Sequence, residues 1–212
     1  MPTVSGMTEE RFLKLRLAVS QRIGTRRFSH TLGVESAIIE LGERYLPGEI
    51  PRLRVAALLH DVTKEWSPVE QVAFCEKHGL PLTDEERSAP RILHAKTGAF
   101  VAARDFSAYV DKGILQAIAL HTTGAEDMTV FDELLYLADY IEPTRTYADC
   151  RALRVAFFEG YDAADDTLGH LHATVKEALL MTVSDIHRAG GTVCTATLEA
   201  VAFLDRKLSA NS

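Results

Sequence analysis

The sequence predicts an all-α fold of about eight to ten helices. Apolar residues recur at helical spacing through most of the chain, as in "RFLKLRLAVSQRI", "TLGVESAIIELGERYL" and "TVFDELLYLADYIEP". Alternating runs bounded by hairpin turns, which would indicate strands, are missing from the sequence. Because helix start and stop residues stand at the ends of the periodic stretches, we expect a helical bundle.

The predicted helix ends have local chemical causes. A Ser or Thr that precedes a Glu by three residues can form a capping box, and proline is favoured at the first helical position. Glycine or proline just after a periodic stretch ends the helix. The start signals are Ser67 with Pro68 and Glu70, and Thr83 with Glu86, and the stop signals are Pro47 with Gly48, Gly79, and Pro143.

The chain offers no clear domain boundary, since it has no low-complexity segment, flexible linker or internal repeat. We expect one domain over residues 1–212, with its motif-bearing core at about 20–160. The segment of about 165–208 is predicted to be a helical hairpin, broken at Gly190 and Gly191, that packs on this core.

Composition excludes several classes of function. The 212 residues are 47% hydrophobic and carry 23 basic against 30 acidic residues, without a basic block, so polymeric nucleic acid is not an expected partner. No apolar run approaches the roughly 20 residues that span a bilayer, and we expect a soluble protein without a membrane partner. The three cysteines, Cys75, Cys150 and Cys194, form no metal or disulfide pattern, which favours the reducing cytoplasm.

Six ligand-capable side chains interrupt apolar helical stretches. A lone histidine on such a face is more often a hydrogen-bonded core residue, which fits His30, His94 or His121 taken singly. Likewise, His60 could be held by its neighbour Asp61, and Asp139 could serve the N-terminus of another helix. Burying all six without a shared partner would cost more than the roughly 5–15 kcal/mol of net stability of a domain. The six residues are His30, His60, Asp61, His94, His121 and Asp139.

A metal centre would remove this cost, because a metal binds neutral imidazole and ionised carboxylate. The set has no thiolate, so iron, manganese, cobalt or zinc are the expected metals. Six ligands exceed the needs of one ion that keeps an open position. Two divalent ions, bridged by one carboxylate and a hydroxide and about 3.5–4 Å apart, would use them all.

Five short motifs carry a resemblance to a known family. The stretches "RFSHTLGV", "LLHDVTKEW", "ILHAKTGAF", "HTTGAEDMT" and "YLADYIEPTR" resemble the HD-domain metal-dependent phosphohydrolases, and more narrowly the bacterial HD-domain symmetrical diadenosine tetraphosphate hydrolases. The resemblance implies an all-helical HD fold, a two-metal centre that is typically iron, and cleavage of this dinucleoside polyphosphate into two ADP. It implies that one metal is held by His30, His60, Asp61 and Asp139 and the second by His94 and His121, with Asp61 bridging and catalytic.

Cations and hydroxyls near these motifs are candidates for substrate binding. Lys64 lies one helical turn after His60 and Arg145 lies just past Pro143, and both are expected to act in catalysis on the phosphates. Each could instead be a solvated surface cation. Weaker substrate-binding candidates are Arg27, Thr122, Thr123 and Gly124, although the last three could simply end a helix.

The remaining histidines are assigned structural roles. His78 suits the last turn of a helix, and His170, His172 and His187 fall in what the sequence suggests is a polar C-terminal part.

Three other functions stay open at this point. An HD nucleotidase or nucleoside triphosphatase would use the same site on another nucleotide. An HD-fold di-iron oxygenase would use similar ligands on a small organic substrate, although Lys64 and Arg145 argue mildly against it. A nucleotide or metal sensor would keep the site but turn over slowly. The sequence also leaves open whether the chain forms a homodimer.

Overall fold

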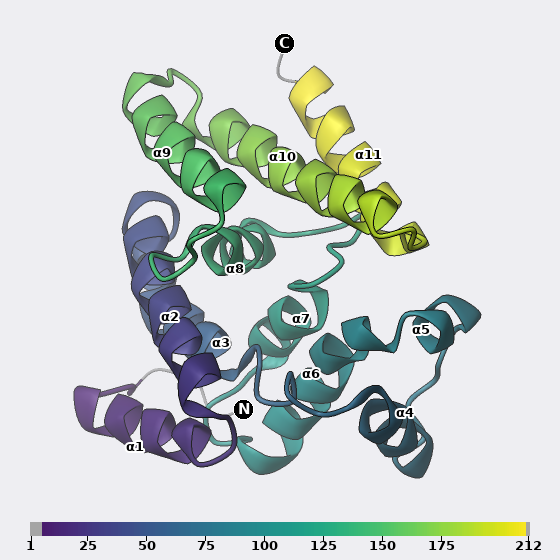
Figure 1. The fold of residues 1–212 in the computed structure, drawn as a ribbon. Helices are drawn as coiled ribbons and strands as arrows, with labels where there is room; N and C mark the ends of the chain where they lie inside the picture. The colour runs from purple at the N-terminus through teal and green to yellow at the C-terminus, as the bar shows by residue number, and fades with distance from the viewer. Residues whose placement is uncertain (1–5, 211–212) are drawn as a thin grey trace.

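The computed structural model describes residues 6–210 and confirms the all-helical class, with eleven α-helices, two 3-10 helices and no strand in that range (Figure 1). The five-residue helix α5 brings the number above the predicted eight to ten. The helices are α1 (Glu9–Ser20), α2 (Thr25–Tyr45), η1 (Pro47–Glu49), α3 (Ile50–Leu59), α4 (Pro68–Lys77), α5 (Asp84–Ser88), η2 (Pro90–Ile92), α6 (Leu93–Asp105), α7 (Lys112–Leu120), α8 (Val130–Ile141), α9 (Ala148–Ala163), α10 (Thr167–Arg188) and α11 (Thr195–Ala210).

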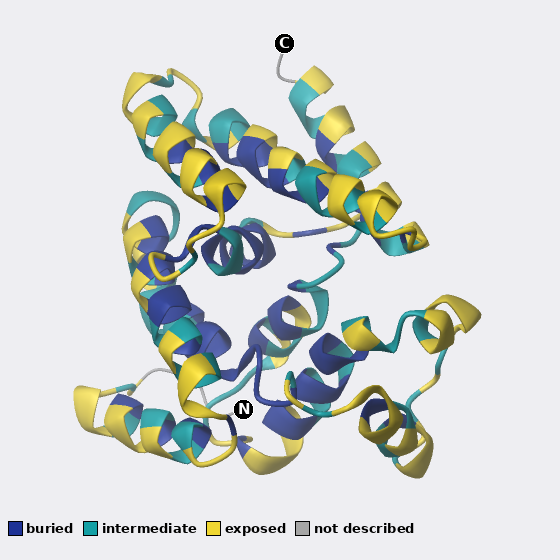
Figure 2. Cartoon of the chain, in the orientation of Figure 1, coloured by how far each residue is buried: buried dark blue, intermediate teal, exposed yellow. Residues whose placement is uncertain are grey.

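Helix α8 lies at the centre of the molecule. Nine of its twelve residues are buried, and Figure 2 draws it almost entirely dark blue. Helices α2, α3 and α7 pack on one side of it, and α9 and α10 pack on the other (Figure 1). A helix that is apolar on nearly all faces must be surrounded by other elements, so α8 provides a fixed frame for the side chains in its last turn.

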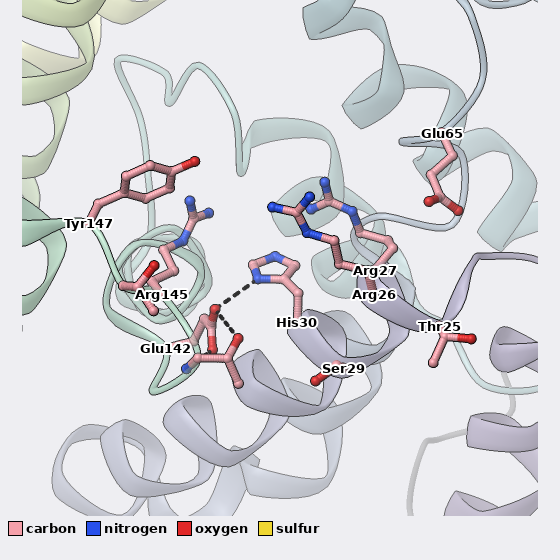
Figure 3. A pocket seen from close by; sticks show the side chains of 11 residues that line it. Thr25, Arg26, Arg27, Ser29, His30, Glu65, Glu142, Arg145 and Tyr147 are labelled. Atoms are coloured by element: carbon pink, nitrogen blue, oxygen red, sulfur yellow. Dashed lines mark hydrogen bonds and ion pairs between the residues drawn. The ribbon is translucent and has the colours of Figure 1, made fainter.

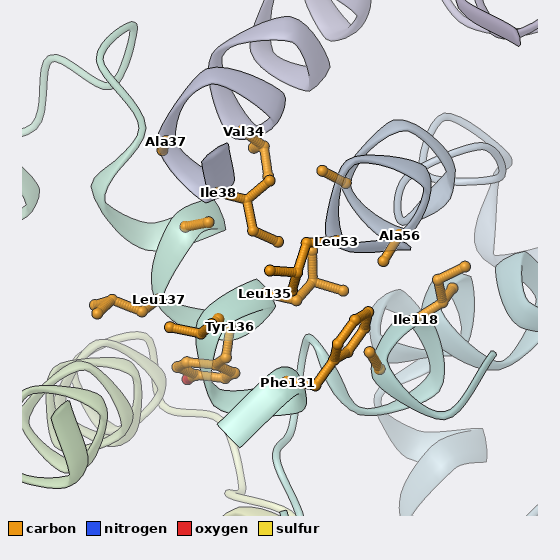
Figure 4. Close-up of a cluster of buried hydrophobic side chains, with 14 of the residues drawn as sticks. Val34, Ala37, Ile38, Leu53, Ala56, Ile118, Phe131, Leu135, Tyr136 and Leu137 are labelled. Carbon is orange, nitrogen blue, oxygen red and sulfur yellow. The ribbon is translucent and has the colours of Figure 1, made fainter. Parts of the chain in front are cut away.

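The core between α8 and its neighbours is built from aliphatic side chains. Leu135 of α8 lies among Ile38 of α2, Leu53 of α3 and Ile118 of α7, and all four are 0% exposed (Figure 4). Fully burying a side chain of this size stabilises the fold by about 1.5–3 kcal/mol. This packing holds the ends of α3 and α7, where predicted ligands lie, close to α8.

The predicted helix boundaries are confirmed at several points. Ser67 with Glu70 and Thr83 with Glu86 both form capping boxes, at the starts of α4 and α5. Gly79, after α4, has a φ of +66°, which glycine adopts without the steric cost of a Cβ atom.

The C-terminal hairpin is formed by α10 and α11, which pack on each other, and α10 also packs on α8. The chain turns between them at Gly190, with a φ of +70°. A polar contact reinforces the packing, because Glu133 of α8, itself 0% exposed, accepts from His172 at 2.7 Å and from Lys207 at 3.0 Å. The expectation that His172 lies in a polar part of the chain is therefore wrong, since its ring is buried against α8.

Within residues 6–210, none of the helices combines the length and the apolar character that crossing a membrane requires.

A buried carboxylate joins the first three helices. Glu35 of α2 is 2% exposed and accepts two hydrogen bonds of 2.8 Å from Arg16 of α1 and one of 3.0 Å from Arg54 of α3. The Arg54 guanidinium also lies over the Phe12 ring, 3.5 Å from its centroid. Helix α2, which carries His30, is therefore joined through Glu35 to both α1 and α3.

We expect Glu35→Ala to lower the free energy of unfolding by about 3 kcal/mol, near the lower end for breaking a buried ion pair. The lower end applies because Arg54 keeps its pair with Glu9 and Arg16 stays partly in water. Urea unfolding followed by circular dichroism measures the change. The control is Glu10→Ala, whose exposed pair with Lys14 should matter by less than about 0.5 kcal/mol. Equal losses in the two variants would contradict a special role for Glu35.

Candidate metal centre

Five helices or helix ends bring the six predicted ligands together. His30 comes from the second turn of α2, His94 from the start of α6 and Asp139 from the last turn of α8. His60 and His121 are the C-cap residues of α3 and α7, and Asp61 follows His60. Side chains at helix ends can project past the packed core, so this placement lets polar groups converge without interrupting a helix.

The Asp61 carboxylate lies between two sets of imidazoles. Its Oδ2 atom is 3.3 Å from His60 Nε2 and 3.7 Å from His30 Nε2. Its Oδ1 atom is 3.4 Å from His94 Nε2 and 3.5 Å from His121 Nε2. Each oxygen therefore faces its own pair of histidines.

The spacing on the Oδ1 side matches a metal's coordination shell. His94 Nε2 and His121 Nε2 lie 3.1 Å apart, which closes a triangle with Asp61 Oδ1. Ligand atoms about 2.1 Å from a tetrahedral or octahedral ion lie about 3.0–3.4 Å from one another. On the Oδ2 side, Asp139 Oδ1 lies 2.9 Å from His30 Nε2 and 3.9 Å from His60 Nε2.

All four imidazoles present the same nitrogen to the centre. The Nδ1 atoms of His60, His94 and His121 each lie 2.7 Å from the backbone carbonyl three residues earlier, and each donates to it. The Nδ1 atom of His30 lies 3.1 Å from Glu142 Oε1. Because Nδ1 carries the proton in this arrangement, the lone pair of Nε2 is free to bind a metal.

Unsatisfied polar atoms test whether these residues fit a metal. Among the residues that the structure describes, three buried side-chain atoms lack a hydrogen-bond partner, namely His30 Nε2, His60 Nε2 and Asp61 Oδ1. All three belong to this cluster. An unpaired buried polar atom costs about 1–3 kcal/mol, so the site is built for a further partner that accepts both imidazole nitrogen and carboxylate oxygen. Two groups here could hold a metal ion, His30 with His60 and Asp139, and His60 with Asp61 and His121.

Charge in the cluster also favours a cation. Burial lowers the pKa of His30, but the carboxylates of Asp139 and Glu142 beside its two ring nitrogens outweigh burial and raise that pKa to about 9. The negative charge around His30 thus favours a positive charge at Nε2, which a bound metal ion would supply in place of a proton. On the other side, burial together with the charge of Lys64 lowers the pKa of His94 to about 3, which keeps that ring neutral and able to bind a metal.

Glu142 is a member of the site that the sequence analysis missed. It is 1% exposed and follows the end of α8, where Thr144 donates to it through its backbone N–H at 2.6 Å and its hydroxyl at 2.7 Å. Gly33 leaves the space that Glu142 fills, since a Cβ atom there would lie 2.2 Å from Glu142 Oε2. Its place in the quoted "YLADYIEPTR", directly before Pro143, was the available signal.

The predicted phosphate-binding cations lie against the centre and not on the surface. Arg27 Nη1 lies 2.8 Å from Asp61 Oδ2, and Arg145 donates to Asp139 Oδ1 at 2.7 Å. Lys64 Nζ lies 3.0 Å from His94 Nε2. The alternative that Lys64 and Arg145 are solvated surface cations does not describe this structure.

The residues after His121 divide into two kinds. The Thr122 hydroxyl lies 3.0 Å from His94 Nε2 and so faces the cluster. Thr123 instead donates to the Gly124 carbonyl, and Gly124, with a φ of +67°, packs against Ala200 of α11. The structure thus brings Thr122 to the centre. The roles of Thr123 and Gly124 are to end helix α7 and to pack against α11.

The histidines assigned structural roles lie elsewhere. The His78 ring packs, tilted, against those of Phe74 and Phe100. His170 lies at hydrogen-bond distance from the Phe157 carbonyl, and His187 is exposed near the end of α10.

A pocket of about 930 Å³ opens beside His30. Figure 3 shows Arg26 and Arg27 on one side of the His30 ring and Arg145 on the other, with Tyr147 at the rim. Three guanidinium groups along this pocket suit an anionic ligand.

Comparison with known proteins supports this geometry. A family model described as "HD domain" matches residues 27–144, which contain all six predicted ligands. The chain is 36% identical over 132 residues to a Bacillus subtilis protein named symmetrical bis(5'-nucleosyl)-tetraphosphatase, covering 61% of this chain and 68% of that one. It is 30% identical over 136 residues to a Halalkalibacterium halodurans protein of the same name, covering 64% and 71%.

A solved structure is similar over nearly the whole chain. A Clostridium acetobutylicum protein, described as a predicted HD superfamily hydrolase involved in NAD metabolism, superposes with a TM-score of 0.81 at 28% identity. The match covers 92% of this chain and 97% of that one.

We expect Asp61→Ala to lower the metal content below two ions per chain and to abolish catalysis, because both oxygens of this carboxylate face ligand pairs. Elemental analysis by mass spectrometry measures the metal, and circular dichroism checks the fold. His78→Ala is the control and should keep its metal, since the His78 ring packs against Phe74 and is not part of the cluster. A variant that retains two metals and normal turnover would refute a bridging role for Asp61.

We expect Glu142→Gln to weaken metal binding by roughly 10- to 100-fold, because the carboxylate orients His30 and increases its basicity. Competition with a chromogenic chelator measures the affinity. Glu65→Gln is the matched control. Glu65 lines the same pocket of 930 Å³ as Glu142, but it accepts a hydrogen bond from the Gly24 N–H and contacts none of the predicted metal-binding histidines. If both variants bind metal equally well, Glu142 has no positioning role.

Proposed function

The chain belongs to the HD domain family, and we propose that it is a metal-dependent hydrolase that cleaves diadenosine tetraphosphate symmetrically into two ADP. The observation that carries the proposal is the two-sided Asp61 carboxylate, with a histidine pair at each oxygen and a cation beside each pair. The name shared by the Bacillus and Halalkalibacterium relatives supports the choice of substrate.

The residues that would hold the metals form two sets that share Asp61. His30, His60, Asp61 and Asp139 would hold one ion, and His94, His121 and Asp61 the other. The donor set suits iron, and also manganese, cobalt or zinc, since it contains nitrogen and oxygen but no thiolate. When bound, such ions supply Lewis acidity, which lowers the pKa of a water and withdraws charge from phosphate oxygens.

The cations of the site would bind the phosphates that flank the cleaved bond. Arg145 donates through Nε to the Asp139 carbonyl at 2.6 Å, a contact that fixes the direction of its guanidinium fork. Lys64 is flexible, and its Nζ lies against the His94 lone pair that a metal would use. From this position the flexible stem of Lys64 could reach a phosphate at the centre, where a mobile point charge can follow the charge that develops on the oxygens.

We also propose that the enzyme works in the cytoplasm, a compartment that keeps thiols reduced. The three cysteines, Cys75, Cys150 and Cys194, are free, as expected in a reducing compartment.

We expect Lys64→Met and Arg145→Met each to lower kcat/KM by roughly 10- to 1,000-fold while the metals stay bound, because these contacts strengthen in the transition state. Steady-state kinetics and metal analysis on the same preparations provide the measurement. Arg104→Met is the control, since Arg104 pairs with Asp105 on the surface. Wild-type rates in both site variants would contradict the proposed roles.

Chromatography of the products decides the reaction. ADP as the sole product supports symmetric cleavage, and ATP plus AMP would mean attack at a different phosphorus. No product from fully metallated protein would refute this substrate. Release of phosphate from mononucleotides would then favour a nucleotidase or triphosphatase, and consumption of dioxygen with an organic substrate would favour an oxygenase.

A further inference from the structure

A second pocket, of about 340 Å³, lies on the other flank of the centre. It is lined by Lys64, Trp66, Pro68, Gln71, Pro90 and Arg91, which come from the turn after Asp61, the start of α4 and the start of η2. Its volume lies within the range of about 300–1,000 Å³ that is typical of small-molecule sites. The lining includes two cations and no carboxylate, so the pocket suits an anionic ligand with a flat apolar part.

The two pockets approach opposite oxygens of Asp61. Arg27 and His30, which line the pocket of 930 Å³, contact Oδ2 at 2.8 Å and 3.7 Å. Oδ1 instead lies 3.4 Å from His94, and His94 contacts Lys64, which lines the pocket of 340 Å³. A ligand that passes over the carboxylate would therefore extend into one pocket at each end.

The side chains of the second pocket are held in place. Gln71 is 2% exposed, donates to the Thr63 carbonyl at 2.7 Å and accepts from Thr97 at 2.6 Å. Trp66 packs its indole against Phe74, with ring centroids 5.0 Å apart, while still lining the pocket. The two prolines have rigid rings. A preformed wall of this kind loses little conformational entropy when a ligand binds.

Resting on the proposed function, we propose that this second pocket holds the distal nucleoside of the substrate, with its base stacked on Trp66 and its phosphates near Lys64 and Arg91. A symmetric dinucleotide consists of two equal nucleoside diphosphate halves, and the bond cleaved lies between them. With that bond at Asp61, one half would enter the arginine-rich pocket and the other would reach Trp66. Stacking on an aromatic ring binds any purine and needs no hydrogen-bond code.

Kinetics of Trp66 variants give the first test. We expect Trp66→Ala to raise KM for diadenosine tetraphosphate by roughly 10- to 100-fold with kcat within about threefold, because a stack present in both ground and transition states is uniform binding. Trp66→Phe should stay within about threefold of wild type, since it keeps an aromatic face. Val69→Ala, at a neighbouring position that is 77% exposed and outside the pocket, should change nothing.

Trp66 is the only tryptophan in the sequence, so intrinsic fluorescence reports on this pocket directly. We expect saturable quenching of metal-loaded wild-type protein by a diadenosine tetraphosphate analogue whose central bridging oxygen is a methylene group. Inorganic tripolyphosphate, which has no base, should leave the fluorescence unchanged. Equal quenching by tripolyphosphate would mean that the pocket binds phosphate alone. Binding of the analogue without quenching would mean that no base stacks on Trp66. Either result overturns the proposal.

The outcomes also separate this inference from the proposed function. If wild-type protein releases ADP but Trp66→Ala, still folded by circular dichroism, has the wild-type KM, only the inference fails. If wild-type protein releases no ADP, the proposed function fails. Trp66 fluorescence is then measured with ADP and with tripolyphosphate. Stronger quenching by ADP shows that the pocket binds a base, and no difference between the two overturns the inference as well.

Discussion

The burial of the Asp61 carboxylate is the constraint on which the site depends. An ionised carboxylate that is 2% exposed is stable only if neighbouring groups supply positive charge or metal coordination. Four imidazoles and the Arg27 guanidinium surround it, but its Oδ1 atom still has no hydrogen-bond partner. The fold is thus arranged around a charge that the described protein atoms compensate only in part, which is the condition that a metal centre satisfies.

The helical framework lowers the free-energy cost of burying these polar groups by placing most of them at helix ends. His60 and His121 cap α3 and α7, and each bonds through Nδ1 to a carbonyl that the helix end leaves free. The same bond fixes the tautomer and turns Nε2 inward. One backbone feature therefore satisfies the helix end and prepares the ligand, while the aliphatic packing around α8 holds the ends at ligand distance.

Much of the fold and the clustering of six polar side chains could be predicted because both depend on local sequence patterns. Helical periodicity predicts the class, and His60 with Asp61 in an otherwise apolar stretch predicts a buried polar centre. Glu142 could not be recognised this way, because it follows the helix and its role depends on Gly33, more than a hundred residues earlier in the chain. His172 was misjudged for a similar reason: its burial depends on the packing of α10 against α8, which places it beside Glu133, a residue distant in sequence.

If Asp61 bridges two metal ions, anomalous diffraction from crystals of the metal-loaded protein should locate both. We expect two anomalous peaks about 3.5–4 Å apart, one at each oxygen of Asp61, with His30 and His60 at one and His94 and His121 at the other. A single peak, or two peaks that do not share Asp61, would contradict that bridging role.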